Sequence, residues 1–350
     1  MPPVLAGRNA LGRLHRNAVP PIVRVFETTF GFVEAKALYV AAELGLADLV
    51  AGAPLDVDAL ATAAATDADA TARLLRLLQG LGYFTQDRDG RWRNTPMSEL
   101  LRSDRADSVR EWVRFVCGPW HGEIWNHAVH SVRTGRSASV EAFGAEYFDW
   151  LTANPDAQTT FDAAMEQSSQ LSGPSLVSGF DFSGVQRICD VGGGTGALLA
   201  TVLAASPSAE GVLFDLPEVV ERAAPVLIAA GVEARVELVA GSFFESVPSG
   251  CDLYLLKAIM HDWADPECVT ILSRIRDASP TARVVVVDQL MPTHRGPHPA
   301  KDSDLMMLVL TGSGRERTEP EFAALVARAG YRVNRVLAMP AIAVQELVAT

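Results

Sequence analysis

The sequence predicts an α/β protein made of a mainly helical N-terminal winged-helix domain and a Rossmann-like, doubly wound sheet of seven strands. Apolar residues recur at helical spacing up to about residue 105, whereas short apolar runs alternate with helical segments after residue 180. A chain of 350 residues is also long enough for two domains, each with its own core. We therefore expect domains at 1–105 and 179–350, joined by linking helices at 106–178.

The N-terminal part has the pattern of a winged helix. Residues 33–51 repeat apolar side chains at helical spacing, and residues 55–96 predict two short helices followed by a turn-rich pair of strands. A module that reads DNA should be basic, yet residues 33–105 contain eight Lys and Arg against eleven Asp and Glu. We expect a dimerisation or lid module, with DNA binding as the alternative.

Composition limits the partners and the compartment. The net charge of -12 repels polyanions, so we expect no nucleic-acid partner. No apolar run approaches the roughly 18 residues of a membrane span, and the N-terminus lacks the apolar block of a secretory signal, which predicts a cytoplasmic protein. The four cysteines lack CxxC spacing, so we expect reduced, mostly buried thiols and no zinc site.

The C-terminal part predicts the sheet strand by strand. Seven short apolar runs are expected to form strands: 185–191, 210–215, 234–241, 251–257, 282–290, 331–339 and 341–349. The last two are joined by a short turn, and a hairpin at the end of a parallel sheet requires one antiparallel strand. Asp265 before Pro266 predicts a helix N-cap, and Thr318 with Glu321 has capping-box spacing.

The stretch DVGGGTG, Asp190 to Gly196, follows the first of these strands. Gly192, Gly194 and Gly196 remove the Cβ atoms that would keep a ligand away from the backbone at the carboxyl end of the sheet. Asp215 lies 19 residues after Gly196, at the tip of the next strand, where its carboxylate can accept both ribose hydroxyls of a nucleoside. The loop therefore predicts a nucleoside cofactor.

Two cofactors suit this loop. Gly192, Gly194 and Ala197 also satisfy the dinucleotide fingerprint, so NAD is one interpretation. However, Asp190 can face a cationic cofactor, the domain follows a long helical half, and it ends in a strand hairpin, unlike most dinucleotide folds. These features favour S-adenosyl-L-methionine, with S-adenosyl-L-homocysteine as the product.

Five motifs occur in order along the chain: DVGGGTG, FDLPEV, GSFFESVP, LKAIMHDWADPECVTIL and GRERTEPEF. With them the chain resembles, over nearly its whole length, the metal-independent small-molecule O-methyltransferases, which include plant caffeate-type enzymes and bacterial enzymes that tailor polyketides and phenazines. The resemblance implies a class I methyltransferase sheet, an N-terminal domain that forms a homodimer, and linking helices that cover the pocket of a small aromatic substrate.

The resemblance also implies roles for individual residues. His261 would be the general base, with Asp288 and Glu316 as the acids beside it. Cofactor contacts are expected for Asp190, Gly192, Gly194, Asp215, Ser242, Phe243 and Lys257. Two positions depart from the family pattern, which often has Asp where this chain has Ser242 and Glu where it has Asp288.

These residue types suit methyl transfer. Aligning oxygen, methyl carbon and sulfur for an in-line displacement is worth up to about 7 to 11 kcal/mol. Proton transfer from a phenol of pKa about 10 to a histidine of pKa about 6.5 costs roughly 5 kcal/mol. A carboxylate beside the histidine raises the histidine pKa and so lowers this cost. We expect Asp262 to point away from the pocket, because neighbouring side chains diverge.

Aromatic and methionine side chains are candidates for the substrate pocket. Helices expected between 107 and 175 are rich in aromatic residues, and methionine suits a flat ring, although core packing explains these side chains equally well. The candidates are Trp120, His121, Phe161, Met165, Met260, Met306 and Met307.

The main hypothesis is an S-adenosylmethionine-dependent O-methyltransferase that acts on an aromatic hydroxyl. A relative with the same fold and cofactor that catalyses hydroxylation or decarboxylation is one alternative, which the presence of His261, Asp288 and Glu316 disfavours. A winged-helix regulator with a ligand-sensing domain is an alternative from another class, and the negative charge disfavours it.

Overall fold

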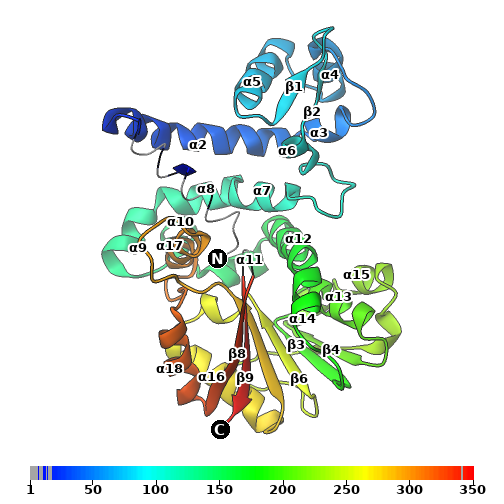
Figure 1. Ribbon diagram of the computed structural model, residues 1–350, viewed down its shortest axis with the longest axis vertical. Helices are drawn as coiled ribbons and strands as arrows, with labels where there is room; N and C mark the ends of the chain where they lie inside the picture. Colours follow the sequence, from blue (N-terminus) through cyan, green and yellow to red (C-terminus); the bar gives the residue numbers. More distant parts are fainter. Residues whose placement is uncertain (1–6, 8–10, 13, 15–17, 340–341) are drawn as a thin grey trace. The chain divides into compact units, whose positions relative to one another are not determined.

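The computed structural model describes residues 7, 11, 12, 14, 18–339 and 342–350 (Figure 1). They form two compact units. The sheet unit comprises Glu123–Gln158 and Ser168–Thr350, and the winged-helix unit comprises the described residues of Pro3–Gly122 together with Thr159–Gln167. The segment 106–178, expected to link two domains, therefore contributes helices to both units.

The sheet unit is built on seven strands in the order β5-β4-β3-β6-β7-β9-β8. Pairing is parallel from β5 to β7, whereas β9 is antiparallel to both β7 and β8, as the terminal hairpin requires. The strands are β3 (Arg187–Val191), β4 (Glu210–Asp215), β5 (Val236–Ala240), β6 (Leu253–Lys257), β7 (Arg283–Asp288), β8 (Tyr331–Ala338) and β9 (Ala343–Ala349).

Helices cover both faces of this sheet, because its central strands are apolar on both sides. Leu253 and Leu255 of β6 pack in one core, whereas Tyr254 and Leu256 pack in the other. The first core includes residues of α12 (Pro155–Gly179), α13 (Ala197–Ala205) and α15 (Ala224–Ala229), and the second includes residues of α16 (Asp265–Ala278) and α18 (Glu319–Arg328). Figure 1 shows these helices on opposite sides of the strands, which confirms the doubly wound α/β class.

Shorter elements complete the sheet unit. They are α9 (Ala128–Thr134), α10 (Ala138–Phe143), α11 (Tyr147–Ala153), α14 (Pro217–Val220), η1 (Glu233–Arg235), η2 (Met260–Asp262) and α17 (Pro299–Thr311). α17 lies beside α9 and α10 (Figure 1). Among the described residues, no helix is long and apolar enough to cross a membrane.

The winged-helix unit has the predicted pattern of short helices followed by a strand pair. Leu60, Leu75 and Phe84 are buried in one core, and Asp56 and Asp67 cap its two middle helices. The elements are α2 (Pro21–Glu43), α3 (Leu46–Leu49), α4 (Val57–Ala63), α5 (Ala68–Gly80), β1 (Phe84–Gln86), β2 (Trp92–Asn94), α6 (Pro96–Glu99) and α7 (Arg110–Val116), and α8 (Pro119–Asn126) spans the boundary between the units.

One of the two predicted helix starts is wrong. Thr318 and Glu321 form the expected capping box at the start of α18. The N-cap of α16, however, is Ala264, and Asp265 is the first helical residue, with no side-chain cap. The Asp265 carboxylate instead accepts hydrogen bonds from the Arg317 guanidinium, because a paired charge is the stronger partner.

The cysteines are free, as predicted. Cys189, Cys251 and Cys268 are buried and Cys117 is half-buried, so they serve as small apolar side chains.

Candidate active site

The predicted cofactor and base residues of the sheet unit gather at one edge of the sheet. Parallel strands present their carboxyl ends at the same edge, and in an open α/β sheet ligands bind where the strand order reverses. That reversal falls between β3 and β6. The glycine loop (Asp190–Gly196) leaves β3 there, and His261 follows β6.

Two glycines of the loop are favoured by their backbone conformation, and one of them also by packing. Gly192 has φ +68°, and a Cβ at this position would lie 2.5 Å from Cδ1 of Ile259. Gly194 has φ +59°, but its Cβ would have no atom within 4 Å. Both positions are left-handed and favour glycine. Only Gly194 therefore faces open space in which a ligand could approach the backbone.

Asp215 lies beside the same loop. Its Oδ2 accepts a hydrogen bond of 2.7 Å from the Gly194 amide, and its Oδ1 accepts one of 2.7 Å from the Leu216 amide. A carboxylate held by two backbone donors is fixed in place. Asp215 thus shapes the glycine loop, and its predicted contact with a ribose stays a prediction.

A buried aspartate and a buried lysine lie near the carboxyl ends of β3 and β6. Asp190 is 1% exposed, and burial raises the pKa of its carboxyl to about 7, helped by Asp215 and opposed by Lys257. Burial lowers the pKa of Lys257 to about 8, opposed by Asp190 and Asp288. The Lys257 ammonium donates to Ser168 Oγ at 3.2 Å, whereas Asp190 Oδ2 has no hydrogen-bond partner in the described part of the chain. This oxygen can receive a donor from a ligand.

Ser242 and Phe243 lie in the loop that follows β5. The Phe243 ring would be 3.6 Å from a Cβ on Gly192, and its centroid lies 6.0 Å from that of Trp263 in an edge-to-face arrangement. Ser242 Oγ accepts from the Phe244 amide at 3.3 Å. Phe243 therefore packs against the glycine loop, while Ser242 shapes the turn beside it.

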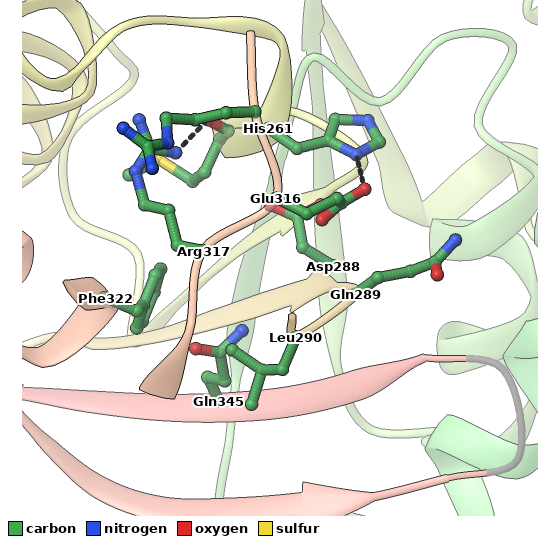
Figure 2. A pocket seen from close by; sticks show the side chains of 10 residues that line it. His261, Asp288, Gln289, Leu290, Glu316, Arg317, Phe322 and Gln345 are labelled. Carbon is green, nitrogen blue, oxygen red and sulfur yellow. Dashed lines mark hydrogen bonds and ion pairs between the residues drawn. The ribbon is translucent and has the colours of Figure 1, made fainter. Parts of the chain in front are cut away.

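His261 lies in the single 3₁₀ turn η2 between β6 and α16, and Figure 2 shows its ring directed toward Glu316. Nδ1 lies 2.9 Å from Glu316 Oε1, and this oxygen also accepts a hydrogen bond of 2.6 Å from Ser303. Glu316 is 2% exposed. The predicted pairing of this histidine with a buried acid is therefore present in the geometry.

The expectation that Asp262 points away from the pocket is wrong. Its Oδ1 lies 3.5 Å from Nε2 of His261, on the opposite side of the ring from Glu316. In an extended strand successive side chains would diverge to opposite faces, but in a 3₁₀ turn they lie only a third of a turn apart. The short carboxylate therefore reaches back to the imidazole.

Asp288 lies at the end of β7 and is 7% exposed. Burial raises the pKa of its carboxyl to about 6, against the opposing charge of His261. Its Oδ1 has no hydrogen-bond partner in the part of the chain that the structure describes. Glu316 supplies the hydrogen bond to the imidazole, whereas Asp288 acts on His261 through its charge.

The three acids dominate the electrostatics of the imidazole. Burial by itself lowers the pKa of His261, but the charges of Asp262 and Asp288 and the hydrogen bond that the ring donates to Glu316 outweigh it and raise the pKa to about 10. Burial also raises the pKa of Asp262 to about 7. The cluster therefore holds a proton on His261 strongly, and the conjugate base is as basic as a phenolate.

A small pocket of about 10 Å³, roughly enough for one water molecule, adjoins this cluster (Figure 2). His261, Asp288 and Glu316 line it together with the segment that follows β7 and with Arg317. Arg317 is a site residue that the sequence did not reveal, although it follows Glu316 directly in the RERT motif. Arg317 is 5% exposed, and its guanidinium points at the His261 turn (Figure 2).

The methionines predicted for the substrate pocket divide by burial. Met260 is 1% exposed and belongs to the core shared with α16 and α18, so core packing accounts for it. Met307 is buried in α17 and Met306 is half-buried beside it. Their role toward a substrate stays a prediction.

The other predicted pocket residues belong to the winged-helix unit. The ring of Phe115 lies 4.2 Å from that of His121 and 5.5 Å from that of Phe161. His121 is 2% exposed, and burial lowers its pKa to about 4, so the ring is neutral at pH 7. Trp120 and Met165 are half-buried in the same unit.

Family comparisons match both units. Residues 125–332 match the model of the O-methyltransferase domain, and residues 26–104 match the O-methyltransferase dimerisation domain. The chain is also 39% identical over 323 residues to the O-demethylpuromycin-O-methyltransferase of Streptomyces alboniger, which covers 91% of this chain and 85% of that protein.

Solved structures of similar proteins extend over the same length. The mitomycin 7-O-methyltransferase MmcR has a TM-score of 0.85 and 35% identity, with 99% of this chain and 100% of that chain covered. An O-methyltransferase from neocarzinostatin biosynthesis, solved with S-adenosylmethionine and 2-hydroxy-5-methyl naphthoic acid, has a TM-score of 0.76 and 31% identity, with 91% and 96% covered.

Proposed function

The chain belongs to the O-methyltransferase family, and we propose that it transfers the methyl group of S-adenosylmethionine to an aromatic hydroxyl of a small specialised metabolite. His261 is the general base in this proposal. The observation that carries it is the 2.9 Å contact between His261 Nδ1 and the buried Glu316, at the sheet edge from which the glycine loop also leaves.

The residues at the sheet edge fit this cofactor. Gly194 leaves its backbone open to a ligand, and Asp190 offers a buried carboxylate oxygen to a cationic group. The nucleoside part would be held by residues at the carboxyl ends of neighbouring strands: Asp215 and Lys257 end β4 and β6, and Ser242 and Phe243 follow β5. When bound, S-adenosylmethionine supplies a methyl carbon made electrophilic by its sulfonium sulfur.

The proton of the acceptor hydroxyl goes to His261 Nε2. The Glu316 carboxylate accepts a hydrogen bond from Nδ1–H, which selects the tautomer whose Nε2 carries a lone pair. Because the neighbouring acids raise the pKa of the imidazole toward that of a phenol, the roughly 5 kcal/mol uphill cost against an unperturbed histidine largely disappears. At neutral pH most of this imidazole is protonated, so the fraction able to accept the proton should rise as the pH approaches its pKa.

We also propose an aromatic substrate, a homodimer and a cytoplasmic location. A naphthoic acid bound to the neocarzinostatin relative supports an aromatic substrate here. The match to the dimerisation domain supports a homodimer, as does α2, on which Phe26, Phe30 and Phe32 are more than half exposed. Calorimetric and hydrodynamic measurements on the purified protein address the first two proposals directly.

The first experiment is a calorimetric titration of the wild type and of Asp215→Ala with S-adenosylmethionine, S-adenosylhomocysteine and NAD. We expect the first two ligands to bind the wild type and to bind the variant more weakly. Phenols are then screened with wild type and His261→Ala. Binding of NAD alone would overturn the proposal, and S-adenosylmethionine that binds but is never consumed would favour a hydroxylase or decarboxylase.

A further inference from the structure

We propose that Arg317 is a positioning residue whose guanidinium holds the backbone on both sides of His261 and so fixes the imidazole for proton transfer. This inference rests on the proposed role of His261. Arg317 itself would touch neither the substrate nor the cofactor, because its guanidinium is engaged with the protein's own carbonyl and carboxylate oxygens.

The guanidinium binds the chain before and after the histidine. Nη1 donates to the Met260 carbonyl at 2.9 Å, and Nη2 donates to the Trp263 carbonyl at 2.9 Å. These carbonyls flank the His261–Asp262 pair, so one rigid, planar group spans the turn. Lysine has the charge but not the fork that reaches both carbonyls.

Asp265 fixes the orientation of the guanidinium. Its Oδ1 accepts from Nε of Arg317 at 3.0 Å and from Nη2 at 2.9 Å. Asp265 also pairs with Arg328, at 3.3 Å, but the Arg328 side chain is 52% exposed. The side chain of Arg317 is 4% exposed. Two arginines thus share one acid, and only Arg317 reaches the turn.

The residues next to Arg317 hold the same turn. The Arg315 amide donates to the His261 carbonyl at 2.8 Å, and Glu316 binds the imidazole itself. The Arg317 carbonyl accepts from the Met291 amide at 2.9 Å, which ties the segment to the chain beyond β7. Three successive residues therefore bind the turn through backbone, side chain and guanidinium.

Gly314 allows this segment to approach. A Cβ on Gly314 would lie 2.6 Å from the His261 carbonyl oxygen and 3.0 Å from that of Asp262. Both atoms are backbone, so they cannot rotate aside. Any larger residue at 314 would push the segment and the turn apart.

The turn needs this external support. η2 is a single 3₁₀ turn with no side-chain cap of its own, and so short a helix is not stable without partners. A displacement of about 1 Å in a catalytic group can lower the rate by about 100-fold. Arg317 therefore stabilises this turn and fixes the position of His261.

The test compares Arg317→Lys with its matched control Arg328→Lys. Both remove an arginine from Asp265, but only the first loses the carbonyls of the turn. We expect Arg317→Lys to lower kcat about 10- to 100-fold with KM and the dissociation constant for S-adenosylmethionine unchanged, because misplacement affects the transition state. Arg328→Lys should retain wild-type kcat. Equal kcat in both variants would overturn the inference.

A second measurement separates positioning from a general loss of structure. In Arg317→Ala, methylguanidinium should restore part of the lost kcat, and ¹⁵N NMR of His261 should show the Nδ1–Glu316 hydrogen bond return with it. If Arg317→Ala does not fold, Gly314→Ala gives the same comparison, with kcat lowered and the cofactor affinity kept. Failure of both to affect the NMR signal or kcat would overturn the inference, whereas full activity of His261→Ala would instead overturn the proposed function.

Discussion

The glycine loop and the His261 turn leave the same edge of the sheet, but they are held in different ways. The loop is held from the adjacent strand: the Gly194 amide donates to the Asp215 carboxylate, 21 residues away. The imidazole binds Glu316, 55 residues away, and the Arg315 amide donates to the carbonyl of His261 in the same turn. The loop is thus fixed by the next strand along the chain, whereas the position of His261 depends on a more distant segment.

This difference predicts that proton transfer at His261 and cofactor binding at the glycine loop can be disrupted separately. The largest effect is expected from His261→Ala, which removes the base and should lower kcat by about 10² to 10⁴. The dissociation constant for S-adenosylmethionine should stay at its wild-type value, because the ring makes no contact with the glycine loop in the described residues. Steady-state kinetics and calorimetry measure the two quantities.

His130→Ala is the control for this change, since His130 is a half-exposed histidine of the same unit whose described charge partner is Glu141. Its kcat should equal that of the wild type. A kcat for His261→Ala within threefold of the wild type would show that another group takes the proton.

The reverse pattern is expected from Asp215→Ala. It removes a charged acceptor from the Gly194 amide, so the affinity for S-adenosylmethionine should fall about 10- to 100-fold. kcat at saturating cofactor should change much less. Glu210→Gln, at the other end of β4 and exposed, is the matched control and should keep wild-type affinity. A large loss of kcat without a loss of affinity would contradict the separation of the two sides.

The pH dependence of kcat/KM tests the predicted pKa of His261. An imidazolium cannot accept a proton, so kcat/KM should rise with pH until His261 loses its proton, near its pKa of about 10. Glu316→Gln removes an interaction that raises this pKa, so the rise should end at lower pH, with a plateau about tenfold lower because the weaker base is also less well oriented.

Using one substrate for both enzymes cancels the titration of the substrate itself. Profiles measured from pH 6 to beyond pH 10 should therefore differ in the position of the rise. Superimposable profiles would mean that Glu316 does not act on the proton of His261.

The smallest effects are expected within the glycine loop. Gly192→Ala forces a Cβ into left-handed backbone and against Ile259, and should destabilise folding by about 1–3 kcal/mol. Gly194→Ala has only the backbone penalty, about 1–2 kcal/mol, but its Cβ enters the open space of the proposed cofactor site. Urea unfolding should therefore rank Gly192→Ala as the less stable variant, while calorimetry should show the weaker cofactor binding in Gly194→Ala. The opposite ranking in either measurement would contradict this account of the loop.

The fold was accessible from sequence because its signals are local. Seven apolar runs of the right length, glycine at the first strand-to-helix turn, and the capping box of Thr318 and Glu321 each depend on a few neighbouring residues. The antiparallel strand followed from the length of one turn. These expectations hold because backbone conformation and burial pattern are set by nearest neighbours.

The two side-chain predictions that the structure contradicts both concern charged residues. Asp265 looked like an N-cap and Asp262 looked directed outward, yet the first pairs with Arg317 and the second lies 3.5 Å from Nε2 of His261. In both cases a partner with the opposite charge, or the shape of a single turn, decided between conformations that local sequence leaves equal.

The sequence by itself thus determined the class of fold and the glycine loop, and it predicted His261 as the base. Only the tertiary structure decided how His261 is held, because Glu316 and Arg317 reach it after two helices, a strand and their connections have intervened. Hydrogen bonds and charges act over a few ångströms in space, and no spacing along the chain reports which distant groups the fold brings within that range.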